Sequence, residues 1–517
     1  MNDLHLKGIV ILDFGSQYTQ LIARRVREQH VFSVILSPEA SIEKILEFDP
    51  AGIIFSGGPS SIYEEHAPKV DKGIFELDIP ILGICYGLHL LIENAGGKID
   101  HLGQGEYGIA HIDEVNSSVL LDGVNDANQV WMSHGDQIVE VPSGWSVYAE
   151  SSNGIIAALG NDKSKLFATQ FHPEVSHSIN GDKIISNFIF RICQATPKWT
   201  PGNFIEDMIE EIQRKVGDNK VLVGVSGGVD SSVVAALLSK AIGEKAVSIL
   251  IDHGLMRKNE CENAVHALKD GLKVNINSYD ESAVFLERLK DVTDPEKKRK
   301  IIGEQFIRSF ERIAKELGEF KYLGQGTLYP DIIESGFNTW GGKSAVIKSH
   351  HNVGGLPENM DFELIEPLKD LFKDEVRSVG RELGLPESLI NRHPFPGPGL
   401  AVRILGSITE ERLKILKDAD EIYMNILHED GIYDEIWQAF SVLIPVKSVG
   451  VMGDKRTYEN LLALRAVTST DGMTADWYKM PAETMSKISN RIVNKVRGIN
   501  RVVYDVTSKP PGTIEWE

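Results

Sequence analysis

The sequence is poor in cysteine, in long apolar runs and in positive charge. Its three cysteines, Cys85, Cys193 and Cys261, lie far apart and form no CxxC pair, so neither a disulfide framework nor a cysteine-rich metal site is expected. No stretch approaches the roughly 18 apolar residues of a membrane span. The apolar run near the N-terminus is too short for a secretory signal. We therefore expect a cytoplasmic protein with no membrane partner.

Positive charge is the scarcer sign, because 54 Lys and Arg stand against 74 Asp and Glu and give a net charge of -20. A surface this acidic repels the polyphosphate backbone of nucleic acids, so no nucleic-acid partner is expected. A mononucleotide is not excluded, since a few phosphates need only a local cluster of donors. The chain of 517 residues exceeds one hydrophobic core and predicts two to four domains.

Patterns of buried strands and amphipathic helices alternate twice along the chain. In the first series, strands are predicted at 8–14, 32–36, 52–56 and 80–85, with helices at 17–30 and 88–95. In the second series, strands are predicted at 220–225, 246–251 and 273–276, with helices at 231–242 and 260–270. Such alternation predicts parallel sheets with helices on both faces. Between the two series, 108–171 is dominated by strand patterns and 182–193 is a closing helix.

The predicted fold class is therefore α/β: two doubly wound, mostly parallel-sheet domains followed by a smaller α+β C-terminal domain. Proline marks both boundaries, because it interrupts regular structure. Residues 197–201 read Pro-Lys-Trp-Thr-Pro, and 393–399 read His-Pro-Phe-Pro-Gly-Pro-Gly. The predicted domains are 1–197, 198–392 and 393–517. In the last one, helices at 409–429 and 484–496 accompany strands at 439–444, 461–467 and 501–506.

A nucleophile is predicted at Cys85. Residues 83–87 read Gly-Ile-Cys-Tyr-Gly where a buried strand meets a helix, which is the thiol version of a nucleophile elbow. The glycines allow a sharp turn, and the N-terminus of the following helix favours a thiolate. This short pattern alone leaves a buried structural cysteine as an equal alternative.

Two further segments favour the nucleophile. Residues 171–174 read Phe-His-Pro-Glu after an apolar strand, and residues two apart in an extended segment share a face, so Glu174 can orient the ring of His172 as a general base. Residues 56–59 read Ser-Gly-Gly-Pro after another strand. The backbone N–H groups of Gly58 and Tyr86 are the predicted oxyanion donors.

Together these residues resemble a class I glutamine amidotransferase over roughly 8–195. The resemblance implies that Cys85 attacks the carboxamide of glutamine, forms a glutamyl thioester and releases ammonia, while His172 transfers the proton. His89 departs from the family, which usually has a glutamine at this position in contact with the substrate.

A phosphate-binding loop is predicted at 226–232, which read Ser-Gly-Gly-Val-Asp-Ser-Ser between a strand and a helix. Backbone N–H groups and the helix dipole hold phosphate in this geometry. The spacing is not that of a Walker A loop, so transfer of a γ-phosphoryl group is not indicated.

The loop instead resembles that of the N-type ATP pyrophosphatases, which release pyrophosphate and form an adenylate. Asp230 is the expected Mg²⁺ ligand, since a carboxylate among phosphates requires a cation. Residues 348–357 read Lys-Ser-His-His-Asn-Val-Gly-Gly-Leu-Pro, a polar, glycine-hinged stretch typical of a lid that would bring Lys348 to the phosphates. The expected ATP-binding residues are Ser226, Gly227, Gly228, Val229, Asp230, Ser231, Ser232 and Lys348.

An ordered series of motifs makes the resemblance more specific. The chain contains, in this order, DFGSQYTQ, SGGPS, CYG, WMSHGD, QFHPEV, SGGVDSS, QGTLYPDIIES, KSHHNVGGLP, HPFPGPG and KPPGTIEWE. This series is similar to that of the glutamine-hydrolysing GMP synthetases over essentially the whole chain. The family implies that ATP adenylates XMP, that ammonia displaces AMP to give GMP, and that the third domain mediates homodimerisation and completes the XMP site. The residues expected to bind XMP are Arg299, Asp331, Gln438, Arg501, Lys509, Ile514 and Glu515.

Other interpretations remain open at this point. The charged run at 297–300 could be a solvated helix face rather than part of a nucleotide site. The same two modules occur in amidotransferases that aminate a deamido-pyridine dinucleotide, although the C-terminal tail and the lid argue against that acceptor. A scaffold or nucleotide sensor without chemistry is a third interpretation, but the candidate residues Cys85, His172, Glu174 and Asp230 are all intact.

Overall fold

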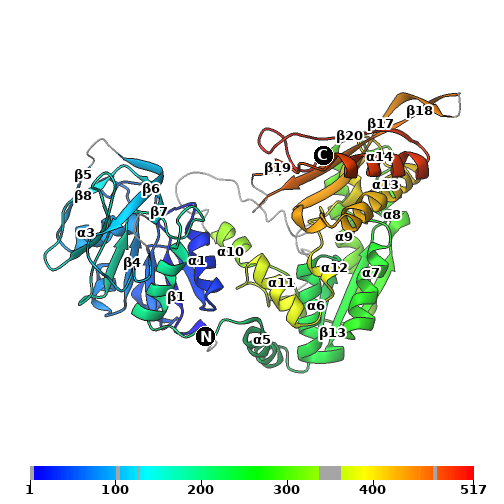
Figure 1. Ribbon diagram of the computed structural model, residues 1–517. Helices are drawn as coiled ribbons and strands as arrows, with labels where there is room; N and C mark the ends of the chain where they lie inside the picture. The colour runs from blue at the N-terminus through cyan, green and yellow to red at the C-terminus, as the bar shows by residue number, and fades with distance from the viewer. Residues whose placement is uncertain (1–4, 101–104, 125–127, 337–361, 453–454, 470–473) are drawn as a thin grey trace. The chain divides into compact units, whose positions relative to one another are not determined.

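The computed structural model describes residues 5–100, 105–124, 128–336, 362–452, 455–469 and 474–517. The chain divides into two compact units, Met1–Asp207 and Met208–Glu517 (Figure 1). Within the described residues, none of the helices combines the length and the apolar character needed to cross a bilayer.

The first unit is built on a nine-stranded sheet in the order β2-β1-β3-β4-β11-β10-β9-β6-β7. The strands from β2 to β11 run parallel, and those from β11 to β7 pair antiparallel. The parallel part consists of β1 (Ile9–Leu12), β2 (Ser33–Leu36), β3 (Gly52–Phe55), β4 (Ile81–Ile84) and β11 (Leu166–Thr169). The antiparallel part consists of β6 (Glu106–Glu114), β7 (Asn128–His134), β9 (Ser146–Ser151) and β10 (Ile156–Asn161). A separate small ribbon pairs β5 (Lys98–Asp100) with β8 (Gln137–Glu140).

Helices pack against this sheet. They are α1 (Thr19–Glu28), α2 (Ile42–Leu46), the 3₁₀ segment η2 (Lys72–Glu76), α3 (Tyr86–Asn94), α4 (Gly181–Ser186) and the π-helical η3 (Asn187–Ile192). Every residue of β1, β3 and β4 is buried, as expected for strands covered on both faces. Thr200 caps α5 (Pro201–Val216) by accepting from the N–H of Asn203 at 3.3 Å.

The second unit begins with a five-stranded, all-parallel sheet in the order β14-β13-β12-β15-β16. Its strands are β12 (Val221–Val225), β13 (Ala246–Asp252), β14 (Ile276–Asp280), β15 (Tyr322–Gly324) and β16 (Glu363–Ile365). Its main helices are α6 (Val229–Ile242), α7 (Glu260–His266), α8 (Ser282–Arg288), α9 (Pro295–Leu317), α10 (Tyr329–Gly336), α11 (Lys373–Glu382) and α12 (Glu387–Ile390). Short segments complete it: η4 (Gly243–Lys245), η5 (Ala267–Gly271) and η6 (Gly399–Arg403).

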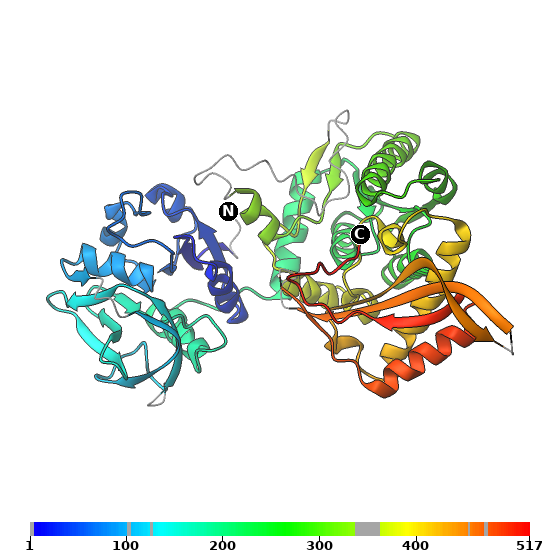
Figure 2. The ribbon, with the colours of Figure 1, turned by 90° about the horizontal axis from the view of Figure 1, so that it is seen from above.

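The C-terminal part of this unit is a mixed sheet with two helices. β17 (Gln438–Met452) and β18 (Lys455–Thr468) pair antiparallel, β19 (Asp476–Trp477) continues the sheet, and β20 (Ile499–Tyr504) pairs parallel with β18. α13 (Glu410–Glu429) and α14 (Ala482–Lys495) lie side by side on one face. The distal part of the β17–β18 ribbon extends beyond these helices (Figure 2).

One hydrophobic core joins the parallel sheet to the C-terminal part, since Leu222, Ile249 and Phe310 belong to the same buried cluster as Leu416, Leu443 and Leu464. The predicted fold class, two parallel-sheet α/β modules followed by an α+β part, is confirmed. The predicted boundary near residue 393 lies inside this second unit and stays a prediction, as does the boundary near 197. The predicted strand at 273–276 was misplaced, because β14 runs from Ile276 to Asp280.

Candidate active sites

Cys85 occupies a strained turn between β4 and α3. Its φ of 52° and ψ of -102° lie outside the regions that L-residues favour, a conformation that costs on the order of 1–3 kcal/mol. Both flanking glycines are required by space. A Cβ on Gly83 would lie 2.6 Å from the carbonyl of Gly87, and one on Gly87 would lie 2.4 Å from the carbonyl oxygen of Phe55. The sharp elbow expected from the Gly-x-Cys-x-Gly spacing is therefore present.

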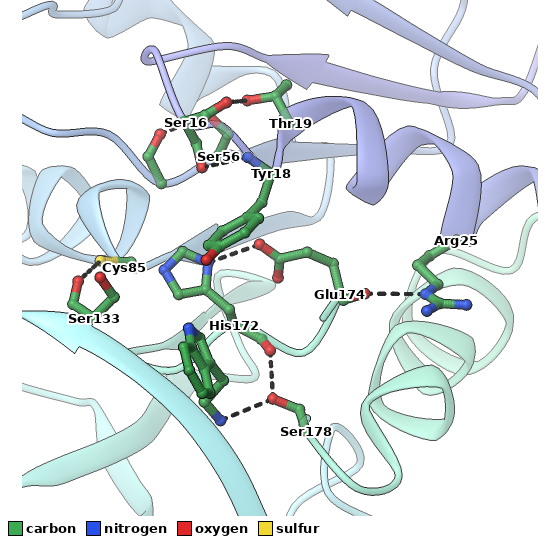
Figure 3. A network of polar contacts seen from close by, with 12 residues as sticks. Ser16, Tyr18, Thr19, Arg25, Ser56, Cys85, Ser133, His172, Glu174 and Ser178 are labelled. Atoms are coloured by element: carbon green, nitrogen blue, oxygen red, sulfur yellow. Dashed lines mark hydrogen bonds and ion pairs between the residues drawn. The ribbon is translucent and has the colours of Figure 1, made fainter. Parts of the chain in front are cut away.

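His172 and Glu174 form a buried pair beside this elbow (Figure 3). The Nδ1 atom of His172 lies 2.7 Å from Oε1 of Glu174. The segment is fixed from both sides, since Arg25 donates to the Glu174 carbonyl at 3.0 Å and Ser178 donates to the His172 carbonyl at 2.5 Å. The ring of Tyr18 packs edge-on against the imidazole, with 5.1 Å between the ring centroids.

The charge state of His172 follows from these neighbours. Burial alone would lower its pKa, but the Glu174 carboxylate and the Cys85 thiol raise the pKa of His172 to about 10. The imidazole is therefore cationic at neutral pH next to a sulfur nucleophile. A thiolate and an imidazolium side by side are the activated form of a cysteine nucleophile.

The two glycines after β3, Gly57 and Gly58, line the site of Cys85 and His172. A Cβ on Gly57 would lie 2.9 Å from Cε1 of His172 and 3.7 Å from Cβ of Cys85, and one on Gly58 would lie 2.6 Å from the carbonyl oxygen of Phe14. In the part of the chain that the structure describes, the N–H groups of Gly58 and Tyr86 donate to no protein acceptor. Both amides remain available for an oxyanion.

The structure adds neighbours of Cys85 that the sequence did not indicate. The thiol donates to the carbonyl of Ser133 at 3.5 Å. The amide nitrogen of Gln170 lies 3.9 Å from the sulfur, and the amide oxygen of Gln170 lies 3.2 Å from Nε2 of His89. The motifs WMSHGD and QFHPEV contain Ser133 and Gln170, but their spacing did not indicate that these two side chains would lie next to Cys85.

The predicted phosphate loop connects β12 to α6. Gly227 has a φ of 75°, which favours glycine. The loop is braced by its own hydroxyls: Ser231 accepts from the N–H of Ser226 at 3.1 Å, and Ser232 donates to the carbonyl of Gly228 at 2.8 Å. Val229 begins the helix, so the first N–H groups of α6 are those of the loop's second half.

Asp230 faces a lysine that the sequence did not indicate. The Nζ of Lys373, the first residue of α11, lies 2.7 and 2.6 Å from the two carboxylate oxygens of Asp230. Arg392 reaches the same loop by donating to the carbonyl of Gly227, and it also pairs with Glu260. Lys348 and the lid predicted at 348–357 lie outside the described residues.

Three of the residues expected to bind XMP meet at the C-terminal tail. Gln438 donates to Glu515 at 2.8 Å, and Ile514 is buried next to it against the C-terminal sheet. Glu515 also receives two hydrogen bonds from Arg403, at 2.8 and 3.1 Å. Arg403 is fully buried with its guanidinium 4.9 Å from the ring of Phe395, which belongs to the proline-rich segment.

Arg299 reaches the tail as well. It donates to the backbone carbonyl of Glu517, while its neighbour Lys298 is fully buried and pairs with the Glu517 carboxylate. Lys298 also donates to the carbonyls of Ile404 at 2.7 Å and Ala401 at 3.1 Å. The alternative that 297–300 is an ordinary solvated face is therefore wrong for Lys298.

The other three residues lie on separate elements. Asp331 accepts from the N–H of Leu328 at 2.9 Å and so caps α10. Arg501 is exposed on β20, opposite Leu461 of β18. The backbone of Lys509 pairs with Ala475, at 2.7 and 3.0 Å.

Three family models match successive parts of the chain. The first is described as Glutamine amidotransferase class-I and covers residues 10–192. The second is described as NAD synthase and covers 202–304, and the third is described as GMP synthase C terminal domain and covers 425–516. These matches place the chain in the class of enzymes that join a class I glutamine amidotransferase to a nucleotide-using synthetase.

Curated relatives match over the full length. The chain is 54% identical over 513 residues to a protein of Brachyspira hyodysenteriae, covering 99% of each chain. It is 52% identical over 519 residues to one of Rippkaea orientalis, covering 99% of this chain and 96% of the relative. Both relatives carry the name GMP synthase (glutamine-hydrolyzing). The chain belongs to the family of glutamine-hydrolysing GMP synthases.

A solved structure from Thermoplasma acidophilum, described as that of a GMP synthase subunit, is 30% identical to this chain. The match covers 37% of this chain and 95% of the solved chain, with a TM-score of 0.35.

Proposed function

We propose that this chain makes GMP by hydrolysing glutamine at Cys85 and by using ATP to adenylate XMP, which ammonia then aminates. The observation that carries the proposal is the strained Cys85 elbow beside the buried His172–Glu174 pair. The full-length similarity to proteins named GMP synthase (glutamine-hydrolyzing) supports the acceptor. The proposed domains are 1–197, 198–392 and 393–517.

At the first site, the Cys85 sulfur attacks the carboxamide carbon of glutamine. The N–H groups of Gly58 and Tyr86 bind the oxyanion that forms. His172, held cationic by Glu174, gives its proton to the leaving nitrogen as the C–N bond breaks, so ammonia departs and a glutamyl thioester remains. His172 then takes a proton from water, which attacks the thioester and releases glutamate and the Cys85 thiolate.

At the second site, the loop from Ser226 to Ser232 binds the phosphates of ATP through its backbone N–H groups and hydroxyls. The C2 oxygen of XMP attacks the α-phosphorus, and pyrophosphate leaves. Ammonia then adds at C2, AMP departs, and GMP is formed. Lys348 is proposed to contact the phosphates as well.

The residues present fit a Mg²⁺ ion that arrives with the nucleotide. No group of three or more His, Cys, Asp or Glu gathers within the described residues to hold a metal unaided. Mg²⁺ is commonly held by one or two carboxylates plus substrate phosphates, and Asp230 supplies such a carboxylate. When bound, the ion would neutralise phosphate charge. The ammonium group of Lys373, which faces Asp230, would contact the phosphates.

The acceptor site is proposed at the tail. Gln438, Ile514 and Glu515 are already joined there, and Arg299 is bound to Glu517. Arg501, Lys509 and Asp331 complete the proposed set. Two buried cations, Arg403 and Lys298, hold the tail in place, so the proposed XMP contacts at Lys509, Ile514 and Glu515 lie on an anchored segment rather than on a free chain end.

A homodimer is part of the proposal, and apolar side chains on the distal β17–β18 ribbon support it. Val446, Val449, Val451 and Tyr458 are 64%, 53%, 73% and 58% exposed. Exposed apolar groups that lie together mark association surfaces. Sedimentation of Val451→Lys alongside the unaltered protein tests this role. A variant that dimerises as strongly as the unaltered protein would contradict it.

A cytoplasmic location is also proposed, because the three free cysteines suit a reducing compartment.

The decisive experiment is a mass balance with XMP, ATP and glutamine. We expect equal amounts of GMP, AMP, pyrophosphate and glutamate. Replacing XMP with a deamido-pyridine dinucleotide tests the acceptor in the same assay. Amination of the dinucleotide, with XMP left unchanged, would refute the proposed acceptor while leaving the glutamine site intact.

A further inference from the structure

The side chain of Gln170 connects the nucleophile to a buried histidine. Gln170 follows β11, is fully buried, and its backbone N–H donates to the carbonyl of Ala157 at 2.8 Å, so its position is fixed. Its amide nitrogen lies 3.9 Å from the sulfur of Cys85, and its amide oxygen lies 3.2 Å from Nε2 of His89. The mechanism above uses neither Gln170 nor His89.

The sulfur needs a different neighbour in each of its charge states. As a thiol it donates to the carbonyl of Ser133, at 3.5 Å. As a thiolate it can only accept, and the Ser133 carbonyl then offers repulsion instead of a hydrogen bond. The amide nitrogen of Gln170 is a donor already facing the sulfur, so it can stabilise the thiolate that attacks glutamine.

The direction of the Gln170 amide depends on His89. An amide presents its NH₂ group to the sulfur only if its oxygen faces the other way, toward a donor. His89 is buried, and burial outweighs the contacts with Gln170 and Asp136 and lowers its pKa to about 4. A neutral imidazole carries one N–H, and the tautomer with the proton on Nε2 donates to the Gln170 oxygen.

We propose that Gln170 is a catalytic residue that donates to the Cys85 thiolate, and that His89 is a positioning residue that sets the direction of the Gln170 amide. This inference rests on the proposed glutamine hydrolysis and assigns further groups to the same site. It also gives His89 a role within this chain, where the family usually has a glutamine.

Other charged groups surround the sulfur and His89, and they stay constant in the variants below. His172 faces the sulfur from the segment after β11, and Glu174 contacts Nδ1 of the His172 ring. His134, on β7, is buried with its Nδ1 3.0 Å from the carbonyl of Asp136 and its Nε2 3.8 Å from Glu106. A change between variants therefore reports the Gln170 donor rather than these groups.

The test measures thiolate reactivity directly. In Gln170→Met, an unbranched apolar side chain replaces the amide. We expect the midpoint of the pH dependence of Cys85 alkylation by iodoacetamide to move up by about one unit, so that the rate at pH values below this midpoint falls about tenfold, the effect of one lost hydrogen bond to a charged group. The rate in Cys85→Ser is subtracted to remove Cys193 and Cys261. An unchanged profile in a variant with wild-type thermal unfolding overturns the role of Gln170.

Two substitutions of His89 separate positioning from packing. The terminal amide of a glutamine reaches as far as Nε2 of histidine, whereas that of an asparagine reaches only to the position of Nδ1. We therefore expect His89→Asn to slow alkylation and glutamine hydrolysis about tenfold, and His89→Gln to restore most of this loss. Equal losses in both overturn the positioning role. If the unaltered protein alkylates at Cys85 but hydrolyses no glutamine, the proposed function fails instead.

Discussion

The ammonium group of Lys373 lies 2.6 and 2.7 Å from the two carboxylate oxygens of Asp230, although 143 residues separate them in the chain. Both side chains are partly exposed, so this pair contributes little to stability by itself. Its position at the phosphate loop matters more. In the proposed ATP site, the cation and the carboxylate that neutralise each other here would each turn to a new partner, the phosphates and Mg²⁺.

Asp230→Asn and Lys373→Met should therefore depress the first half-reaction. We expect each variant to form the XMP adenylate at least tenfold more slowly than wild type with either nitrogen source, because each loses a charge that is proposed to face phosphate or metal. Isotope exchange between pyrophosphate and ATP in the presence of XMP measures this step. Lys369→Met, an exposed lysine four residues before Lys373, is the matched control. Wild-type exchange in Asp230→Asn would show that Mg²⁺ is held elsewhere.

The two reactions should be separable by one substitution. Cys85→Ala should abolish GMP formation from glutamine and leave GMP formation from ammonium salts near the wild-type rate, because the thiol only supplies the nitrogen donor. Cys193→Ala removes a thiol that packs against Gly52 and serves as the control, with both activities retained. Equal loss with both nitrogen sources in Cys85→Ala would rule out independent sites.

The fold was predictable where side chains are buried on both faces. The short strands β1, β3 and β4 and the helix after Cys85 were located within one or two residues. The strands at 439–444 and 461–467 were predicted too short, because β17 and β18 continue past the core as a ribbon. In that ribbon Val449 and Val451 are exposed and interleaved with glycine and polar residues, so the apolar pattern ends although the pairing does not. β14 was misplaced for a related reason: only Ile276 of this edge strand is buried.

Some residues of the candidate sites could be predicted from the sequence, and others could not. Cys85, the His172–Glu174 pair and the predicted phosphate loop are local motifs at the ends of strands, so candidate sites could be predicted there from the sequence. Gln170 meets Cys85 across 85 residues and Lys373 meets Asp230 across 143, so their partnership arises only when the sheets assemble. Gln170 lies in the motif QFHPEV, but that motif does not indicate its contact with Cys85, and a single exposed Lys carries no spacing that distinguishes it from its many counterparts.

A buried histidine should make the second unit sensitive to acid. Nε2 of His393 lies 3.0 Å from the carbonyl of Tyr433, and Nδ1 accepts from the N–H of Ala439 at 3.2 Å. Burial lowers the pKa of His393 to about 4. Because this folded-state pKa lies below that of an unfolded histidine, near 6.5, stability is complete above about pH 6.5 and falls as the pH drops toward 4.

His393→Gln isolates this effect, since glutamine can donate to the Tyr433 carbonyl and cannot bind the extra proton. The difference in unfolding free energy between wild type and His393→Gln should change by up to about 1.4 kcal/mol per pH unit between pH 6.5 and 4.5, in favour of the variant at low pH. Urea unfolding at several pH values measures it. A difference that does not vary with pH would mean that His393 titrates alike in both states.

The tail offers a test of acceptor binding at Lys509. The tail is held by Arg403 through Glu515, by Lys298 through Glu517, and by the backbone pairing of Lys509 with Ala475. Removing the side chain of Lys509 leaves all three attachments in place. A cation on an anchored segment of an acidic protein is suited to bind the XMP phosphate, and one charge-assisted contact of this kind contributes about 1.5–3 kcal/mol.

Lys509→Ala should therefore raise the XMP concentration for half-maximal rate roughly tenfold to a hundredfold, with glutamine hydrolysis unchanged. Lys495→Ala, an exposed lysine on α14, should leave the XMP requirement as it is. If a folded Lys509→Ala protein keeps wild-type XMP affinity, the phosphate is bound by other cations and Lys509 has only a structural role in the tail.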